Sequence, residues 1–571
     1  MKKIYKFIVV LVFLTGTLSC NKDFLDETPQ DFFGKENAFK TDADFTASVN
    51  NLYRLVRNEF YTVNDFQPFH YLYRTDLGYD ITVGSPNLIS DYNPTTGIQG
   101  SHWTNLYKII AEANTINSRI PASSMTNANK TLFEARARFF RAFAYRSLVY
   151  LFGGVPLVLE ETVVEKTDYV RATKKEVLAQ IIEDLKFAAA NLPAIGAVKD
   201  GEISSLAANH LLAEAYIADG QYQNAVDAAT VVIDDPATDL MTARFGSRST
   251  VTPGDPYWDL FQVRNQNRVS AGNREAIWVI QMEPDVIGGG ASTAAGSQNG
   301  VYALERVHAP LVRDLRINSV PAFTWPVGDY TGGRGVGFLA PSQHFRETIW
   351  QSDYNNDIRN ANHNFVRDFI GTNPLSPYFG QVISTKNPPA GAVGINGAIV
   401  AGKNDRAFYP YQSKATTPFT HPTNLYTNPA STDAIKKLEL KSGAGGTYRD
   451  EYMFRLAETY LLRAEAYLGL GNNTGAAAAD INVVRARANA SPVLPGNVNI
   501  DYILDERLRE LGVEEKRMLT LMRLGKAFDR VSRLNPVYTS VMQPHFNLWP
   551  IPQVEIERNR TGKLDQNPNY N

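Results

Sequence analysis

The chain has 571 residues and a net charge of −2 at pH 7, with 57 Lys or Arg against 59 Asp or Glu. This length fits one large domain or two fused ones, and the charge balance gives no long-range field that would attract a polyanion. A nucleic-acid-binding protein normally carries a basic stripe, and the sequence shows none. Aromatic residues make up 11% of the chain, which supplies core side chains and also flat apolar faces for ligands.

Residues 1–19 are predicted to be a lipoprotein signal peptide. They begin with a positive segment that contains Lys2, Lys3 and Lys6. The apolar run 7–18 follows, which is too short to span a bilayer as a helix but fits a signal peptide. Cys20 is the only cysteine and follows a small residue, so we expect cleavage before Cys20 and lipidation of its thiol; the alternative is a buried core cysteine. Thr17 departs from the leucine that is commonest at this position of such motifs.

Residues 20–40 are predicted to form the lipidated tether, which carries the acidic side chains of Asp23, Asp26 and Glu27. Two or three acyl chains hold a protein stably on a membrane. Beyond the signal peptide, no segment approaches the roughly 18 consecutive apolar residues that a spanning helix needs. We therefore expect residues 41–571 to form a folded body that the lipid anchors.

Residues 41–240 are predicted to be the N-terminal helical part of that body. Apolar residues recur at helical spacing over 175–191. Thr173 and Glu176 form a capping box before this run, and Pro193 ends it. Residues 134–150 are another long amphipathic run.

Residues 241–447 are predicted to be a loop-rich insertion that faces the ligand. This segment is rich in Gly, Pro, Asn, Ser and Tyr, and no helical period persists in it. Such composition is typical of loops and short strands, where binding residues concentrate. The glycine-rich stretch 332–337 lacks dinucleotide-binding spacing and predicts a flexible turn.

Residues 448–571, the C-terminal helical part and tail, repeat a pattern of the first part. The two copies have the same spacing: Ala213, Tyr216, Gly220 and Ala225, and then Ala464, Tyr467, Gly471 and Ala476. Small residues let two antiparallel helices approach closely, and the glycine turns the chain, as in tetratricopeptide pairs. The predicted fold class is therefore mostly α, with tetratricopeptide-like helix pairs that form a scaffold around the irregular insertion.

Three glutamates near the C-terminus are spaced for one face of a helix. Glu506, Glu510 and Glu514 lie four residues apart, and Arg517 follows one turn later. An acid/base pair is one interpretation of these carboxylates. We favour the other, an ion-paired scaffold.

Ordered segments along the chain resemble the SusD/RagB family. The resemblance covers residues 20–29, 103–114, 134–145 (EARARFFRAFAY), 152–157 (FGGVPL), 255–261, 275–278, 455–467, 481–488, 506–525, 549–552 (WPIP) and 565–568. Glu515 stands where glycine is usual in the family, and Thr520 stands where aspartate is usual. Both departures lie in predicted scaffold helices, so the expected fold is unchanged.

The resemblance implies an outer-membrane lipoprotein that faces the cell exterior and binds oligosaccharides. In this family the protein is a lid on a SusC-like TonB-dependent transporter, to which it delivers the ligand without catalysis. The acidic residues after Cys20 resemble the family's surface-export signal. Three alternatives stay open: peptide cargo on the same fold, a protein-interaction scaffold, and a hydrolase.

Sugar binding requires aromatic faces beside polar groups, and two regions offer both. A pyranose ring packs its C–H bonds on Trp or Tyr, and its hydroxyls need polar partners at the edge. The first region supplies Tyr79, Asp80, Trp103 and Asn105. The insertion supplies Trp325, Asp329, Tyr330, Trp350 and Tyr354, and later Tyr378, Tyr409 and Tyr411. We expect the other tryptophans, Trp258, Trp278 and Trp549, to be core residues.

The sequence shows no motif for catalysis or a cofactor. No two of the eight histidines lie three or four residues apart, so a helical metal pair is missing. A G-x-x-x-x-G-K-[ST] phosphate loop is also missing. We expect no catalytic residues, no metal ligands and no cofactor beyond the lipid on Cys20. Bound calcium is left open.

Overall fold

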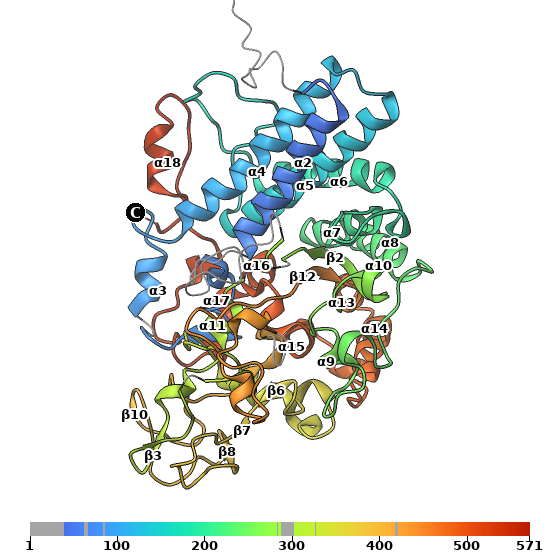
Figure 1. Cartoon of the computed structure of the whole chain (residues 1–571). Coiled ribbons are helices and arrows are strands. Elements are labelled where there is room, and N and C mark those ends of the chain that lie inside the picture. The colour runs from blue at the N-terminus through green and yellow to red at the C-terminus, as the bar shows by residue number, and fades with distance from the viewer. Residues whose placement is uncertain are drawn as a thin grey trace, which may run out of the picture.

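The computed structural model describes residues 39–61, 67–83, 86–282, 284–286, 302–325, 327–416 and 421–570. The chain is mostly helical, as predicted (Figure 1). The predicted signal peptide, Cys20 and the tether up to residue 38 lie outside the described residues. Among the helices that are described, none is both long and apolar enough to cross a membrane.

Long helices that pack side by side form the N-terminal part (Figure 1). The elements here are α2 (Asp42–Phe60), β1 (Gly78–Asp80), α3 (Pro86–Asp91), α4 (Gln99–Arg119), α5 (Asn127–Phe152) and α6 (Lys174–Asn191). The predicted capping box is present, because the Thr173 hydroxyl accepts from the Glu176 backbone while the Glu176 carboxylate accepts from the Thr173 backbone. Helix α6 then ends two residues before Pro193. The observed ends of α6 therefore lie within one residue of the ends predicted from the sequence, 175 and 191.

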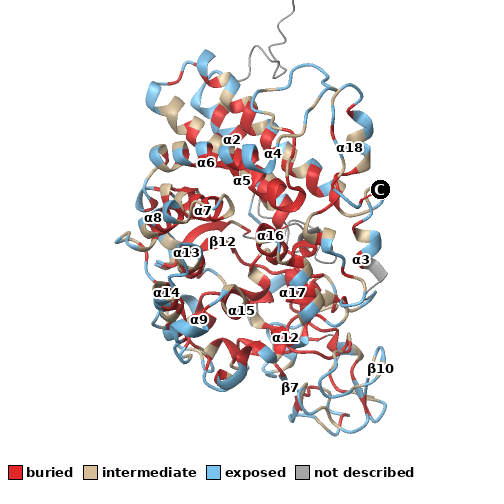
Figure 2. Cartoon of the chain, turned by 180° about the vertical axis from the view of Figure 1, so that it is seen from behind, coloured by how far each residue is buried: buried red, intermediate tan, exposed pale blue. Residues whose placement is uncertain are grey.

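Helix α5 is the centre of the helical part. From Phe139 to Phe152 every residue is buried, as expected of a helix surrounded by others. Its two buried arginines are paired: Arg141 Nη2 lies 2.7 Å from Asp184 of α6, and Arg146 Nη2 lies 2.7 Å from Glu214. Figure 2 shows buried residues gathered on α5, α16 and β12.

The predicted repeats are two helix pairs that pack on each other. The first pair is α7 (Ser205–Ala218) with α8 (Tyr222–Ile233), and the second is α13 (Leu456–Gly469) with α14 (Thr474–Arg487). Helix α13 packs against α7 and α8. A Cβ at Gly469 would lie 2.4 Å from the Tyr222 ring, so the glycine permits this close approach.

The glutamate shared by both repeats has the same structural role in each copy. Glu214 binds Arg146 of α5, and Glu465 binds Arg523 of α16 at 2.7 Å. Arg523 Nε also lies 3.8 Å from Glu214. One arginine therefore joins the two repeats, although they are far apart in the sequence.

The insertion between the repeats contains short elements. They are α9 (Pro256–Asp259), α10 (Arg268–Ala271), β2 (Ala276–Ile280), α11 (Leu304–His308), β3 (Arg316–Ile317), β4 (Val320–Pro321), β5 (Leu339–Pro341), α12 (Gln343–Arg346), β6 (Phe365–Val366), β7 (Asp368–Ile370), β8 (Val382–Ser384), β9 (Ala392–Gly394), β10 (Gly397–Ala398) and β11 (Tyr411–Gln412). Strands β3, β7, β8 and β10 lie at the end of the molecule far from α2 and α6 (Figure 1). A second apolar core, which includes Phe323, Val327 and Tyr409, supports this end.

An antiparallel strand pair ties the insertion to the C-terminal part. Strand β2 pairs with β12 (Glu451–Arg455), with Ile280 opposite Glu451 and Val279 opposite Tyr452. The ladder leads directly into α13. It therefore fixes where the second repeat begins relative to the insertion.

The remaining helices are short, and Glu514 does not lie on the helix predicted for it. They are α15 (Ile500–Glu510), α16 (Arg517–Arg523), α17 (Ala527–Leu534) and α18 (Gln553–Arg558). Glu514 does not continue the helix of Glu506 and Glu510, because α15 ends at Glu510 and Gly512 has φ +51°. Glu514 lies instead in the short 3₁₀ turn Gly512–Glu514. The break turns Arg517 toward Asp76, 2.7 Å away.

The three glutamates form a buried ion network, as favoured from the sequence. Glu510 binds Arg455 at 2.5 Å, Arg359 at 2.9 Å and also Arg487. All four side chains are 1% exposed or less. Burial alone would raise the pKa of Glu510, but the three arginines outweigh burial and hold its pKa far below the usual value.

Glu506 and Glu514 extend the network in opposite directions. Glu506 binds Arg359 at 2.8 Å and Arg485 at 2.9 Å. Glu514 binds Arg455 at 2.7 Å and lies 3.4 Å from Lys414. The arginines and the lysine come from the insertion, from β12 and from α14, so the network joins three parts of the chain.

We expect Glu510→Gln to lower the free energy of unfolding by about 3–5 kcal/mol, because it leaves three buried arginines short of one carboxylate charge. Glu183→Gln is the control, since that side chain is 69% exposed and its loss should change stability by less than about 0.5 kcal/mol. Urea unfolding of both variants measures the difference. Equal stabilities would contradict the structural role given to Glu510.

Candidate functional site

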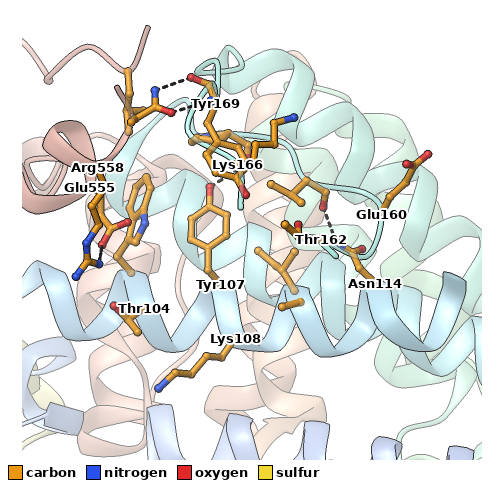
Figure 3. A pocket seen from close by; sticks show the side chains of 17 residues that line it. Thr104, Tyr107, Lys108, Asn114, Glu160, Thr162, Lys166, Tyr169, Glu555 and Arg558 are labelled. Atoms are coloured by element: carbon orange, nitrogen blue, oxygen red, sulfur yellow. Dashed lines mark hydrogen bonds and ion pairs between the residues drawn. The ribbon is translucent and has the colours of Figure 1, made fainter. Parts of the chain in front are cut away.

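A groove along α4 is one place where the described chain offers aromatic side chains beside polar ones. It has a volume of about 460 Å³ and is bordered by the loop 156–169 and by α18. Figure 3 shows Tyr107 pointing from α4 toward Lys166 and Tyr169, while Lys108 points away from them. Trp103 also lines this groove.

Several polar groups of the groove are occupied by its own framework. The Tyr107 hydroxyl donates to the Pro156 carbonyl at 2.8 Å, and Asn114 Nδ2 donates to the Val158 carbonyl at 2.8 Å. Asn559 holds the backbone of Tyr169 with two hydrogen bonds, of 2.7 and 2.8 Å. The exposed polar side chains of the groove include those of Thr104, Lys108, Glu160, Thr162 and Lys166.

The predicted contacts Trp103 and Asn105 serve the core. Trp103 is 5% exposed, and its ring packs on Phe152 at 5.1 Å and on Tyr107 at 5.0 Å. Asn105 Nδ2 donates to the buried carboxylate of Glu59 at 3.0 Å. The two side chains lie on different sides of α4, Trp103 toward Phe152 of α5 and Asn105 toward Glu59 of α2. Trp103 keeps only 5% of its surface exposed, at the groove, and the amide of Asn105 is engaged by Glu59.

Tyr79 and Asp80 are likewise used within the protein. Both lie on β1, which pairs with β5. The Tyr79 hydroxyl accepts from Asn404 Nδ2 at 3.0 Å. Asp80 is 5% exposed, and its carboxylate accepts from the backbone and the hydroxyl of Thr82 at 2.8 and 2.6 Å. Asp80 thus stabilises a turn and is turned away from solvent.

In the insertion, Trp350 is a core residue and Tyr354 is half-buried. Trp350 is 1% exposed, and its Nε1 donates to the Phe345 carbonyl at 3.0 Å. Its ring therefore has no free face for a ligand. The ring of Tyr354 lies near two cations, Lys386 at 4.6 Å and Arg367 at 5.3 Å from its centroid.

The later tyrosines and the remaining tryptophans are mostly core residues. Tyr409 is fully buried and Tyr411 is 3% exposed, so only the half-buried Tyr378 among the three keeps accessible surface. The predicted core tryptophans are confirmed as buried: Trp258, Trp278 and Trp549. The side chain of Tyr330 lies outside the described part of the chain.

Trp325 differs from every other tryptophan because its side chain is 53% exposed. Two arginines lie at its ring: Arg334 Cζ is 4.8 Å and Arg313 Cζ is 5.2 Å from the ring centroid. Both are within the range of a cation–π contact. We call this group of Trp325, Arg313 and Arg334 the Trp325 platform.

Hydrogen bonds hold the backbone on both sides of Trp325. The Thr324 N–H donates to Thr372 Oγ1 at 3.0 Å, and the Leu440 N–H donates to the Val327 carbonyl at 3.0 Å. Phe323 and Val327 are buried in the second apolar core. The chain is thus anchored immediately before and after the exposed indole.

Asp329 lies in a buried charged cluster that adjoins the platform through Glu305, and it is not a free ligand contact. It is 1% exposed and its carboxylate lies 2.5 Å from His421 Nδ1, while the Tyr426 hydroxyl donates to its other oxygen. His421 Nε2 lies 2.9 Å from Glu305. Burial alone would lower the pKa of His421, but the carboxylates of Asp329 and Glu305 outweigh burial and raise it to about 10.

The glycine-rich stretch is a packed turn, which corrects the prediction of a flexible one. Gly332 and Gly333 are buried with φ of +88° and +69°. A Cβ at Gly333 would lie 2.2 Å from the Glu305 carboxylate, and one at Gly332 would lie 2.5 Å from the Tyr411 hydroxyl. The turn holds Arg334 in place, because the Arg334 N–H donates to Glu305 at 2.9 Å.

The structure therefore keeps one predicted residue, Trp325, as an exposed aromatic face and adds two that were missed. Arg313 and Arg334 reach the ring from a 3₁₀ turn and from the glycine turn, and no periodic spacing links them to Trp325. Within the described residues no group of three or more His, Cys, Asp or Glu is placed to hold a metal.

Family models match both halves of the chain. The model described as "SusD family" matches residues 275–570, and the model described as "Starch-binding associating with outer membrane" matches residues 23–217. The chain belongs to the SusD/RagB family.

Relatives and solved structures agree over almost the whole length. "SusD-like protein P25" of Formosa agariphila is 23% identical over 97% of this chain and 96% of its own. A structure titled "Laminarin binding SusD-like protein" has a TM-score of 0.63 at 22% identity, covering 93% of this chain and all of that one. Surface glycan-binding protein A from Bacteroides thetaiotaomicron, in complex with laminarihexaose, has a TM-score of 0.63 at 19% identity, covering 92% and 100%.

The buried cluster beside the platform makes stability depend on pH. The pKa of His421 is raised from 6.5 to about 10 in the folded chain, so its stabilising charge is fully present below pH 6.5 and is lost as the pH rises through about 10. The difference in unfolding free energy between the wild type and His421→Gln should therefore be largest below pH 6.5 and shrink toward pH 10. Urea titrations at several pH values measure it. A difference that stays constant with pH would show that His421 is not charged in the folded protein.

Proposed function

We propose that this protein is an outer-membrane lipoprotein that binds oligosaccharides at the Trp325 platform. It passes them to a SusC-like TonB-dependent transporter and performs no chemistry on them. The observation that carries this proposal is the indole of Trp325, which is 53% exposed and has the guanidinium groups of Arg313 and Arg334 at its ring. Hydrogen bonds hold the backbone at Thr324 and Val327.

The platform has the groups that a sugar needs. The indole offers a flat apolar surface for the C–H bonds of a pyranose ring. The guanidinium groups of Arg313 and Arg334 are pure donors and suit ring hydroxyls or charged substituents as acceptors. Since the platform is held by the second apolar core and by the buried His421 cluster, binding requires little ordering of the protein.

Three findings support the cargo and the location. One structural neighbour is titled as binding laminarin and another is bound to laminarihexaose. One matching family model is described as starch-binding and associated with the outer membrane. Cys20, which lies outside the described residues, directly follows an apolar run that is typical of a lipoprotein signal.

The buried carboxylates beside the platform are not placed for hydrolysis, and the exposed one next to Arg313, Asp314, is a single group. A glycosidase places two carboxyl groups on opposite sides of the scissile bond. Asp329 and Glu305 both contact the same imidazole, that of His421, and both are buried. They are partners of His421 and are not available to flank a sugar.

We expect Trp325→Ala to weaken oligosaccharide binding by about 1–3 kcal/mol, as for other ligands stacked on an aromatic side chain. The melting temperature should stay nearly unchanged, because the exposed indole supports no core. Calorimetric titration and thermal unfolding measure the two effects.

Trp350→Ala is the matched control for this variant. That indole is 1% exposed, so its removal should cost about 3–5 kcal/mol of stability and leave the affinity of the folded protein unchanged. If the Trp325→Ala protein is stable and binds the oligosaccharide with wild-type affinity, the binding site does not include Trp325.

We expect Cys20→Ala to release the protein from membranes without unfolding it, because the acyl chains supply the attachment. Fractionation of cells that express each form measures the location, and circular dichroism of the released protein checks the fold. Membrane attachment that survives the substitution would refute lipidation at Cys20.

A further inference from the structure

We propose that the Trp325 platform selects glycans that carry negative charge, as uronate carboxylates or sulfate esters. This inference rests on the proposed function and names the class of its ligand. It is drawn from the arrangement of charge around Trp325. Arg313 is exposed and Arg334 is half-buried at the ring. Glu305 and Asp329 are buried and engaged with His421, and the exposed carboxylate beside Arg313, that of Asp314, makes a long ion pair.

The two buried carboxylates beside the platform, Glu305 and Asp329, are engaged by groups other than the two guanidinium groups. Glu305 accepts from the Arg334 backbone through one oxygen and lies 2.9 Å from His421 through the other. Asp329 uses its two oxygens for His421 and Tyr426. Both carboxylates thus have His421 as their charged hydrogen-bonding or ion-pair partner, and neither forms an ion pair with the guanidinium group of Arg313 or Arg334 in the described part of the chain.

Arg334 is held at the ring without a polar partner for part of its head group. Its Nη1 atom is buried and has no hydrogen-bond partner within the described residues. Burial, together with the charges of Arg313 and Arg306, lowers the pKa of Arg334, against the opposing effect of Glu305. An anion bound here would supply the missing acceptor and would also reduce the repulsion between these cations.

Arg313 is the accessible half of the pair. Its side chain is 42% exposed, and its ion pair with the neighbouring Asp314 is long, at 3.5 Å, and equally exposed. Such a surface pair contributes little, so a ligand can compete for the guanidinium group.

The combination of groups distinguishes acidic sugars from neutral ones. A guanidinium group binds a carboxylate or a sulfate through two parallel charge-assisted hydrogen bonds, which are roughly twice as strong as neutral ones. The exposed part of the indole can pack on the sugar ring that carries the charged substituent. Because the whole chain has a net charge of only −2, this selectivity is a local property of the platform.

The test is calorimetric titration of the full chain, purified in detergent, with matched probes. Oligogalacturonides are compared with their methyl esters, and sulfated galactan oligosaccharides are compared with their desulfated forms. Laminarihexaose is the neutral reference. We expect saturable binding to an acidic probe, at least about tenfold weaker binding to its neutral counterpart, and weaker binding of the acid as NaCl rises from about 50 to about 500 mM.

Substitution of Arg313, the exposed arginine, tests whether the platform arginines recognise the charged group of the glycan. Arg313→Gln should weaken binding of the acidic probe about tenfold, Arg313→Lys should retain most of it, and all variants should melt like the wild type. Arg316→Gln is the matched control, since Arg316 is an exposed arginine on β3 that donates to the Ser319 carbonyl at 3.3 Å.

The outcomes separate this inference from the proposed function. Binding of laminarihexaose or of the neutral members alone would overturn the preference for charge and leave glycan binding intact. Equal effects of Arg313→Gln and Arg316→Gln would overturn the role of the platform arginines in charge recognition. If no acidic or neutral probe binds measurably, both the preference for charged glycans and glycan binding itself are contradicted.

Discussion

The fold depends on the carboxylate of Glu510, because three parts of the chain meet at it. Arg359 comes from the insertion, Arg455 from β12 and Arg487 from α14, and all of them are buried with the glutamate. Buried charges are tolerated only when each has partners of good geometry. The need to satisfy them fixes how the insertion lies against the second repeat, and a small shift of any element would leave a charge unpaired.

The platform repeats this principle on a smaller scale. A buried cation, His421, lies between Asp329 and Glu305, and the glycine turn closes over Glu305. This cluster and the second apolar core hold Trp325 at the surface, although the insertion has little regular secondary structure. The chain thereby combines a helical scaffold with a loop-borne surface, and loops are where recognition residues are usually found.

Periodicity and capping made the helices predictable, whereas the site depended on contacts between distant residues. The ends of α6 follow from Thr173, Glu176 and Pro193, and the repeats follow from the spacing of small residues. Composition could not separate Trp325 from Trp350, since both lie in the same loop-rich segment and only packing exposes one and buries the other. The end of α15 was missed because a Cβ at residue 512 would lie 2.1 Å from Gln412, a neighbour about 100 residues away that forces a glycine turn.

The most direct test is a crystal structure of the protein with the oligosaccharide that it binds most tightly. We expect a sugar ring packed against the exposed indole of Trp325, with Arg313 and Arg334 donating to its substituents and with the glycosidic bonds intact. A ligand seated in the groove beside Tyr107, with Trp325 free, would contradict this expectation.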